Sequence, residues 1–281
     1  MADKRKPGDE EIDVFGLTHI GKVRSENQDH FLICSLHQYM KVHGTSLPDQ
    51  DLAMSPKRLA FLGMVADGVG GNAAGEAASR LALSAVASYV SESLNCYYVN
   101  DTRHEEHFTN ALHDSVRNCH DRVLMDTERN PLHKGMATTL TLVISVWPRA
   151  YVVQVGDSRT YLLRDRKLLQ LTRDQTIAQD LVDAGALDPG EAEKSRWKKV
   201  LSSCIGGKGV GPVVGAFEVN WGDTILLCSD GLTKHLDDNE ITAYLTKAEG
   251  AKIACEGLLE QALERGGEDN ITIVVGRLPA E

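Results

Sequence analysis

The chain alternates between short apolar runs and segments in which apolar residues recur at a helical spacing. The apolar runs predict strands at 12–17, 30–35, 59–66, 138–146, 151–155, 159–163, 167–171, 213–219, 224–228 and 271–275. The helical spacing predicts helices at 74–94, 104–125, 176–184, 238–246 and 251–265. Helices grouped between runs of strands indicate an α+β fold, because a doubly wound sheet would alternate strand and helix regularly.

The strands expected between residues 138 and 171 are too close in sequence to be parallel neighbours, since a parallel crossover needs about a dozen residues or more. They predict an antiparallel meander. With the predicted helices outside, the whole inventory fits a central antiparallel β-sandwich flanked by helix pairs, in α-β-β-α layers.

The organisation along the chain indicates one domain. No internal repeat or linker divides residues 12–281, and the polar residues 1–11 predict a flexible N-terminal tail. Residues 37–57 predict an insertion or long loop, and the Gly-, Lys- and Glu-rich stretch 185–212 predicts irregular structure.

Composition narrows the class of protein. The 281 residues are 42% hydrophobic and 25% charged, which is typical of a globular protein. The formal net charge of -10 disfavours nucleic acid as a partner. No apolar segment follows the first residues as in a signal peptide, and the longest apolar runs are too short to span a bilayer. We therefore expect a cytoplasmic monomer with no membrane partner.

Neither the cysteines nor the histidines indicate a disulfide framework or a zinc site. The six cysteines are scattered without a C-x-x-C pair, which favours buried thiols in a reducing compartment over a disulfide framework. Four histidines share one predicted helix, at positions 104, 107, 113 and 120, but without a zinc-binding spacing. They predict a solvated helix face.

Four aspartates occupy the ends of predicted strands. Asp67 and Asp230 each follow an apolar strand and precede a glycine, whereas Asp29 and Asp269 lie just before strands. If the fold brings four carboxylates together, they raise one another's pKa values or bind cations. Mg²⁺ and Mn²⁺ prefer oxygen ligands, and two such ions balance four aspartates and activate a bridging water.

The glycines that follow these aspartates, Gly68 and Gly231, have two readings. They could let the chain turn sharply and approach an ion or a phosphate closely. Alternatively, Asp-Gly is ordinary turn chemistry at the end of a strand.

Arg24 lies five residues before Asp29. A guanidinium there could grip a phosphoryl group with two hydrogen bonds and supply positive charge that the acidic surface lacks. Taken alone, Arg24 would more often be an ordinary solvated arginine.

Six short motifs occur in order along nearly the whole chain. They are G-x-x-R-x-x-N-Q-D at 21–29, V-A-D-G-x-G-G at 65–71, G-M-x-T-T at 135–139, V-G-D-S-R at 155–159, C-S-D-G-L at 228–232 and E-D-N-I-T at 268–272. This series resembles that of the type 2C, metal-dependent serine/threonine protein phosphatases in their bacterial form.

The resemblance implies a fold and a mechanism. It implies a β-sandwich flanked by helix pairs, with two Mn²⁺ or Mg²⁺ ions held by Asp29, Asp67, Asp230, Asp269 and the backbone carbonyl of Gly68. It also implies that Arg24 binds the substrate phosphate and that a bridging hydroxide attacks phosphorus in line, without a phosphoenzyme. The implied partners are phosphoprotein substrates of a serine/threonine kinase.

Three positions depart from the family pattern. Lys234 stands where many bacterial members carry an aspartate that helps to hold a third metal ion. An ammonium group repels cations, so we expect two ions and doubt a third at its other implied ligand, Asp157. Gln175 replaces a usual histidine, and Val69 stands where eukaryotic members have a histidine proposed as general acid.

Two other functions remain open at this stage. The same two-metal chemistry could hydrolyse nucleotides or other small phosphates. The chain could also be an inactive sensor that keeps the phosphatase fold, although the presence of all four aspartates and Arg24 argues against it. A dinucleotide site at 68–73, which formally matches G-x-G-x-x-A, is disfavoured because no second parallel strand ending in an acid follows.

Overall fold

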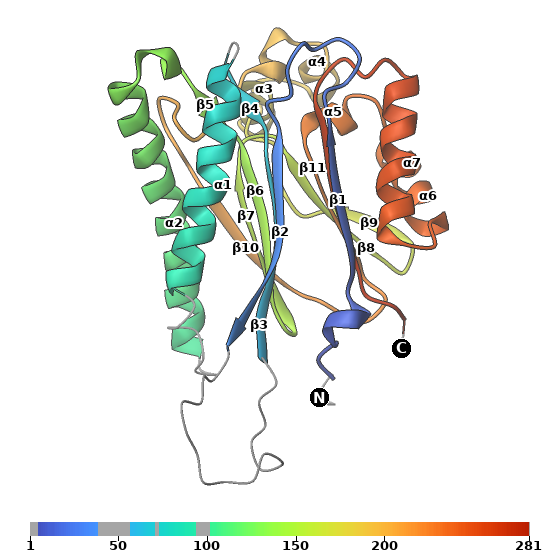
Figure 1. Cartoon of the computed structure of the whole chain (residues 1–281). Coiled ribbons are helices and arrows are strands. Elements are labelled where there is room, and N and C mark those ends of the chain that lie inside the picture. The colour runs from blue at the N-terminus through green and yellow to red at the C-terminus, as the bar shows by residue number, and fades with distance from the viewer. Residues whose placement is uncertain (1–4, 39–56, 71–72, 94–101, 281) are drawn as a thin grey trace, which may run out of the picture.

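A computed structural model describes residues 5–38, 57–70, 73–93 and 102–280. The loop expected at 37–57 therefore lies almost wholly outside the described residues. Within these ranges the chain forms a layered α+β structure (Figure 1).

Two five-stranded antiparallel sheets form the centre. The strand order in the first sheet is β1 (Asp13–His19), β12 (Ile271–Arg277), β11 (Thr224–Cys228), β8 (Arg159–Arg164) and β9 (Lys167–Gln170). In the second sheet it is β10 (Val213–Glu218), β7 (Arg149–Val155), β6 (Leu140–Val146), β3 (Lys57–Ala66) and β2 (His30–Gln38). A separate short pair joins β4 (Gly68–Val69) to β5 (Ala137–Thr138).

Two pairs of helices cover the outer faces of the sandwich. The long helices α1 (Ala73–Ser93) and α2 (Thr102–Arg129) pack on the second sheet, and α6 (Asp238–Lys247) and α7 (Ala251–Glu264) pack on the first (Figure 1). The predicted α-β-β-α layers are confirmed.

Alternation along the strands builds a core on both sides of each sheet. In β3, Met64 faces the helices α1 and α2, whereas its neighbour Val65 faces the opposite sheet. In β12, Val274 faces between the sheets and Ile273 faces α7. Because successive side chains of a strand point to opposite faces, one apolar run serves two core layers.

The predicted meander between residues 138 and 171 is wrong in one respect. The strands β6 and β7 form a hairpin in the second sheet, whereas β8 and β9 form a hairpin in the first. The chain changes sheets at Gly156, whose φ of 100° is readily adopted only by glycine. Sequence spacing indicates antiparallel pairing but does not say in which sheet each hairpin lies.

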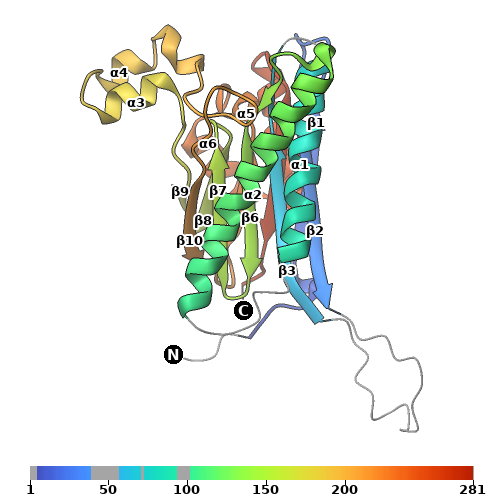
Figure 2. The ribbon, with the colours of Figure 1, turned by 90° about the vertical axis from the view of Figure 1, so that its left-hand side faces the viewer.

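A small lobe follows β9 and projects beside the strand ends (Figure 2). It contains α3 (Ile177–Asp183), α4 (Pro189–Ala192) and the 3-10 turn η5 (Arg196–Lys199). Two short helical elements thus occupy the stretch 185–212, where we expected irregular structure. Other short helical elements are η1 (Asp9–Glu11), η4 (Pro131–His133) and α5 (Asp230–Thr233).

Residues 5–11, which we expected to belong to a flexible tail, contact the sandwich. The buried side chain of Arg58 in β3 pairs with Asp9 and donates a hydrogen bond to the carbonyl of Pro7. The indole N–H of Trp221 donates a hydrogen bond of 3.1 Å to the carbonyl of Arg5.

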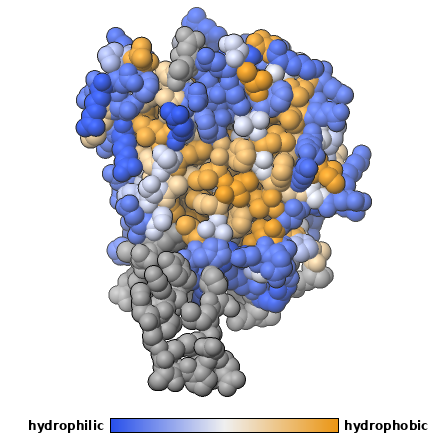
Figure 3. Space-filling view, viewed as in Figure 1, coloured by the Kyte–Doolittle hydropathy of each residue, from blue (hydrophilic) through white to orange (hydrophobic). Residues whose placement is uncertain are grey.

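The edge strands β1 and β2 lie on the same side of the sandwich, between the two helix pairs. Figure 3 shows apolar surface along this side. Deeper between the sheets lies a cavity of about 90 Å³, lined mainly by apolar side chains and by Gly63.

We expect Gly63→Ala to be neutral or to stabilise the protein by up to about 1 kcal/mol, because it restricts the unfolded chain. A Cβ at Gly63 would make ordinary contacts, 3.8 Å from Val274 and 3.9 Å from Leu227. Urea denaturation of the two proteins measures the difference. A loss of more than about 1 kcal/mol would show that the sheets cannot accommodate one methyl group here.

Candidate metal centre

The antiparallel pairing brings the four strand-end aspartates to one end of the sandwich. His30 at the start of β2 is paired with Ala66 at the end of β3, so the adjacent residues Asp29 and Asp67 are neighbours. Likewise Cys228 at the end of β11 is paired with Ile273 in β12. Asp230 and Asp269, just beyond these strands, therefore meet at the same end of the first sheet.

Contacts across the two sheets fix Asp29. Its side chain is only 2% exposed, and its Oδ2 accepts a hydrogen bond of 2.8 Å from Thr272 Oγ1 of β12. Its Oδ1 and the Oδ1 of Asp230 are buried without a hydrogen-bond partner among the described residues. Unpartnered buried carboxylate oxygens are costly unless a cation completes them. The donor set therefore fits hard divalent ions.

Two threonines of the G-M-x-T-T motif hold the backbone of Asp67. Its carbonyl oxygen accepts from Thr138 Oγ1 and from the backbone N–H of Thr139, each at 2.9 Å. Its own N–H donates to Thr139 Oγ1 at 3.0 Å. These bonds hold the backbone of Asp67 in place at the end of β3.

The glycines after the two aspartates have a different role from the one proposed from sequence. The structure gives neither Gly68 nor Gly231 a positive φ. A Cβ on Gly231 would instead overlap the carbonyl oxygen of Asn270, and one on Gly68 would overlap the carbonyl oxygen of Gly75. Both glycines let a second backbone segment pack against the strand end, which brings Asp230 close to the loop that carries Asp269.

Asn270 ties this loop to the segment that carries Arg24. Its Nδ2 donates to the carbonyls of Ile20 and Glu26, each at 2.9 Å, and its Oδ1 accepts from the N–H of Gln28 at 2.9 Å. Sequence reasoning gave Asn270 and Thr272 no role, although both belong to the E-D-N-I-T motif.

Two cations already contact the carboxylates. Arg24 Nε lies 2.7 Å from Asp269 Oδ1, and Lys234 Nζ lies 2.7 Å from both Asp230 Oδ2 and Asp269 Oδ2. The Arg24 side chain, expected to face a phosphate, is thus paired with Asp269 while remaining 55% exposed. The part of the chain that the structure describes contains no cluster of three or more His, Cys, Asp or Glu side chains arranged to hold a metal ion.

The environment of the other three carboxylates, those of Asp29, Asp67 and Asp157, favours their protonated forms. Burial is the main cause that raises the pKa of Asp29 to about 6 and that of Asp157 to about 7, and it raises the pKa of Asp67 well above its usual range. Neighbouring aspartates add to each shift. Burial also acts on Asp269, but hydrogen bonds from Arg24 and Lys234 outweigh it and lower that pKa. Positive charge therefore reaches the carboxylate cluster at Asp269, from Arg24 and Lys234, and at Asp230, from Lys234.

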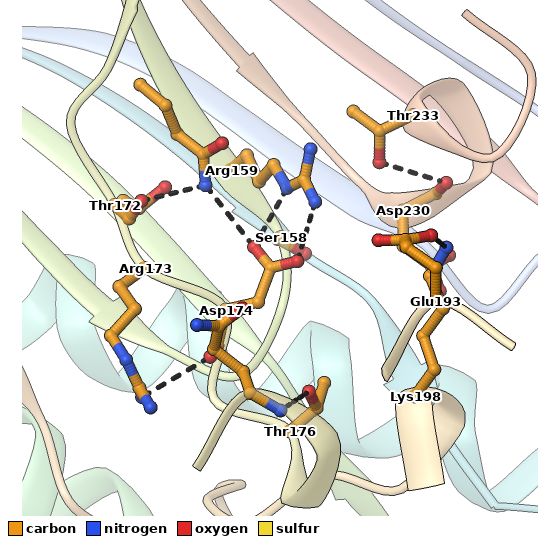
Figure 4. A network of polar contacts seen from close by, with 12 residues as sticks. Ser158, Arg159, Thr172, Arg173, Asp174, Thr176, Glu193, Lys198, Asp230 and Thr233 are labelled. Carbon is orange, nitrogen blue, oxygen red and sulfur yellow. Dashed lines mark hydrogen bonds and ion pairs between the residues drawn. The ribbon is translucent and has the colours of Figure 1, made fainter. Parts of the chain in front are cut away.

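Asp157 lies in the turn where the chain changes sheets, and Gln175 holds that turn. Gln175 Oε1 accepts from the N–H of Gly156 at 2.8 Å, and its Nε2 donates to the carbonyl of Gly211 at 2.9 Å. Next to it, Asp174 pairs with Arg159 through two hydrogen bonds of 2.7 and 2.8 Å (Figure 4). Gln175, noted from sequence only as a missing histidine, thus joins the Asp157 turn to the base of the lobe.

Comparisons with known proteins agree with this arrangement. Residues 42–265 match the family model described as protein phosphatase 2C. The chain is 30% identical over 261 residues to the protein phosphatase PhpP of Streptococcus pneumoniae, covering 92% of this chain and 94% of that protein.

The chain belongs to the protein phosphatase 2C family. It is also 38% identical over 211 residues to the serine/threonine protein phosphatase PstP of Mycobacterium tuberculosis, which covers 75% of this chain but only 39% of that protein. The chain thus matches about two fifths of the length of PstP. A crystal structure of the PstP catalytic domain with two manganese ions superposes with a TM-score of 0.73 and 31% identity, covering 95% of this chain and 98% of that one.

The type 2C fold accounts for the two-sheet sandwich with its flanking helices. Among the described helices, none is long and apolar enough to cross a membrane.

We expect Gly231→Ala to lower the free energy of unfolding by about 3 kcal/mol, because the new methyl group forces Asn270 and its loop away. The same displacement should weaken Mn²⁺ binding. Denaturation and Mn²⁺ titration measure the two effects, and Gly63→Ala serves as the matched glycine control. Unchanged stability would show that the loop yields without cost.

The raised pKa values predict how stability of the metal-free protein depends on pH. Carboxyls with pKa values of about 6 and 7 in the folded state, against about 3.9 when unfolded, bind protons more tightly in the folded protein. Their contribution is complete below about pH 4 and is lost as the pH rises through 6 and 7.

In EDTA we therefore expect the Tm to fall between pH 5.5 and pH 8. Mn²⁺ should remove or reverse this trend, because the ions bind the ionised carboxylates. Asp157→Asn should reduce the slope in EDTA. Scanning calorimetry tests this, and a Tm that rises with pH in EDTA contradicts it.

Proposed function

We propose that this chain hydrolyses phosphoserine and phosphothreonine monoesters with Asp29, Asp67, Asp230, Asp269 and the carbonyl of Gly68 as ligands of two Mn²⁺ or Mg²⁺ ions. The observation that carries this proposal is the pair of buried, unpartnered oxygens, Asp29 Oδ1 and Asp230 Oδ1, at one end of a type 2C fold. Bound ions would supply positive charge and a water acidic enough to attack phosphorus near neutral pH.

The protein groups then have separate tasks. Thr138 and Thr139 hold the backbone of Asp67, and Thr272 holds the carboxylate of Asp29. Arg24 comes from an exposed loop and can exchange its Asp269 partner for a phosphate oxygen, since a guanidinium binds both groups with the same geometry. Because the attacking oxygen comes from water, no protein nucleophile is needed and no phosphoenzyme forms.

We propose phosphoproteins made by a serine/threonine kinase as substrates, and a cytoplasmic monomer as the form of the enzyme. Gln175 links the turn at Asp157 to the lobe, and we propose that the lobe contacts the protein substrate.

A second function, hydrolysis of nucleotides or other small phosphates, would use the same ions. The exposure of Arg24 and Val69 at the site favours a large substrate that approaches from solvent. Turnover of a phosphothreonine peptide panel compared with a nucleotide panel separates the two.

We expect Asp67→Asn to lower kcat for p-nitrophenyl phosphate in Mn²⁺ by about a thousandfold or more, because the variant loses a carboxylate central to the site. The control is Asp165→Asn in the exposed β8–β9 turn, where asparagine tolerates the φ of 50°. This control should keep full activity. Equal activity of Asp67→Asn and wild type, or wild-type activity that persists in EDTA, contradicts the proposed metal centre.

A further inference from the structure

Lys234 occupies an unusual position for a lysine. It follows the short helix α5, one turn after Asp230, and its Nζ lies 2.7 Å from the carboxylates of both Asp230 and Asp269. These carboxylates come from different segments, at the end of β11 and before β12. A single ammonium group thus bridges two proposed metal ligands.

The ammonium group is held there rather than solvated. The Lys234 side chain is 30% exposed, and burial alone would lower its pKa, but the charges and hydrogen bonds of Asp230 and Asp269 raise it above the usual value. The charge also acts on Asp157, whose pKa Lys234 lowers against the effect of burial. One lysine therefore contacts or influences three carboxylates of the cluster.

The charge of Lys234 can be compared with that of an aspartate at the same position. The family resemblance implies that many bacterial members carry an aspartate at this position. An exchange of aspartate for lysine changes the charge by two units, which is the charge of one divalent ion. The lysine thus supplies, without a metal, the neutralisation that an aspartate would obtain only by recruiting another ion.

We propose that Lys234 is a tethered cation that takes the place of a third metal ion, bridges Asp230 and Asp269 before metal binds, and limits the site to two ions. This inference rests on the proposed metal centre. It assigns Lys234 a positioning role, because the lysine acts on the ligands and not on the substrate.

The proposal predicts the number of ions bound. Chelator-stripped wild type, titrated with MnCl₂ in a calorimeter, should take up two ions per chain, and so should Lys234→Arg, which keeps the charge. Lys234→Asp should take up three. The double variant Lys234→Asp/Asp157→Asn should return to two, because it lacks one ligand of the added site.

The neutralisation of Asp230 and Asp269 by Lys234 in the metal-free protein can be measured separately. In EDTA, Lys234→Met should lower the Tm by about 3 to 6 °C, since Asp230 and Asp269 then repel each other. In the same variant the weaker Mn²⁺ site should tighten about tenfold, because a competing charge is gone. Lys252→Met is the matched control: it removes an exposed lysine at 3.7 Å from Glu256 and should change neither quantity.

The outcomes separate this inference from the proposed function. Uptake of three ions by wild type, or of two by Lys234→Asp, overturns the role of Lys234. An unchanged Tm of Lys234→Met in EDTA overturns the bridging before metal binds. The expected ion numbers without hydrolysis of any phosphopeptide leave the role of Lys234 standing and overturn only the proposed function. Absence of Mn²⁺ binding in wild type overturns both.

Discussion

The concentration of negative charge at one end of the sandwich is the constraint on which the rest of the structure depends. Asp29, Asp67, Asp157, Asp230 and Asp269 all reach this end, because each lies at or just beyond the end of a strand. Buried like charges oppose folding. Ion pairs with Arg24 and Lys234 offset part of this cost. A raised pKa, as at Asp29, offsets another part, because it favours the uncharged form of the carboxyl group.

This constraint explains why so many uncharged side chains surround the site. The threonines at 138, 139 and 272 and the amides of Asn270 and Gln175 bind backbone or carboxylate groups around the aspartates. Each of these contacts fixes a position without adding charge. These contacts hold the backbone around the aspartates and, through Thr272, the carboxylate of Asp29.

The sequence was sufficient for the layers and for the place of the aspartates. Strand periodicity and ordered motifs predicted the sandwich, and the family resemblance implied that the four strand-end aspartates would share one site. The change of sheet at Gly156 could not be predicted, because it depends on packing between sheets rather than on local pattern. For the same reason the packing role of Gly68 and Gly231 was not predicted: the neighbours that exclude a side chain, Gly75 and Asn270, are adjacent only in space. The pairing of Arg24 with Asp269 joins residues 245 positions apart and has no local signal.

The large sequence separation of these contacts also determines when the site forms during folding. The hydrogen bond between Thr272 and Asp29 spans 243 residues, and β1 pairs directly with β12. Contacts between distant parts of a chain close large loops and slow folding. The full set of aspartates is therefore assembled only when β2 and β3 of one sheet pack against β11 and β12 of the other. The proposed metal centre is consequently a property of the two packed sheets together and not of either sheet alone.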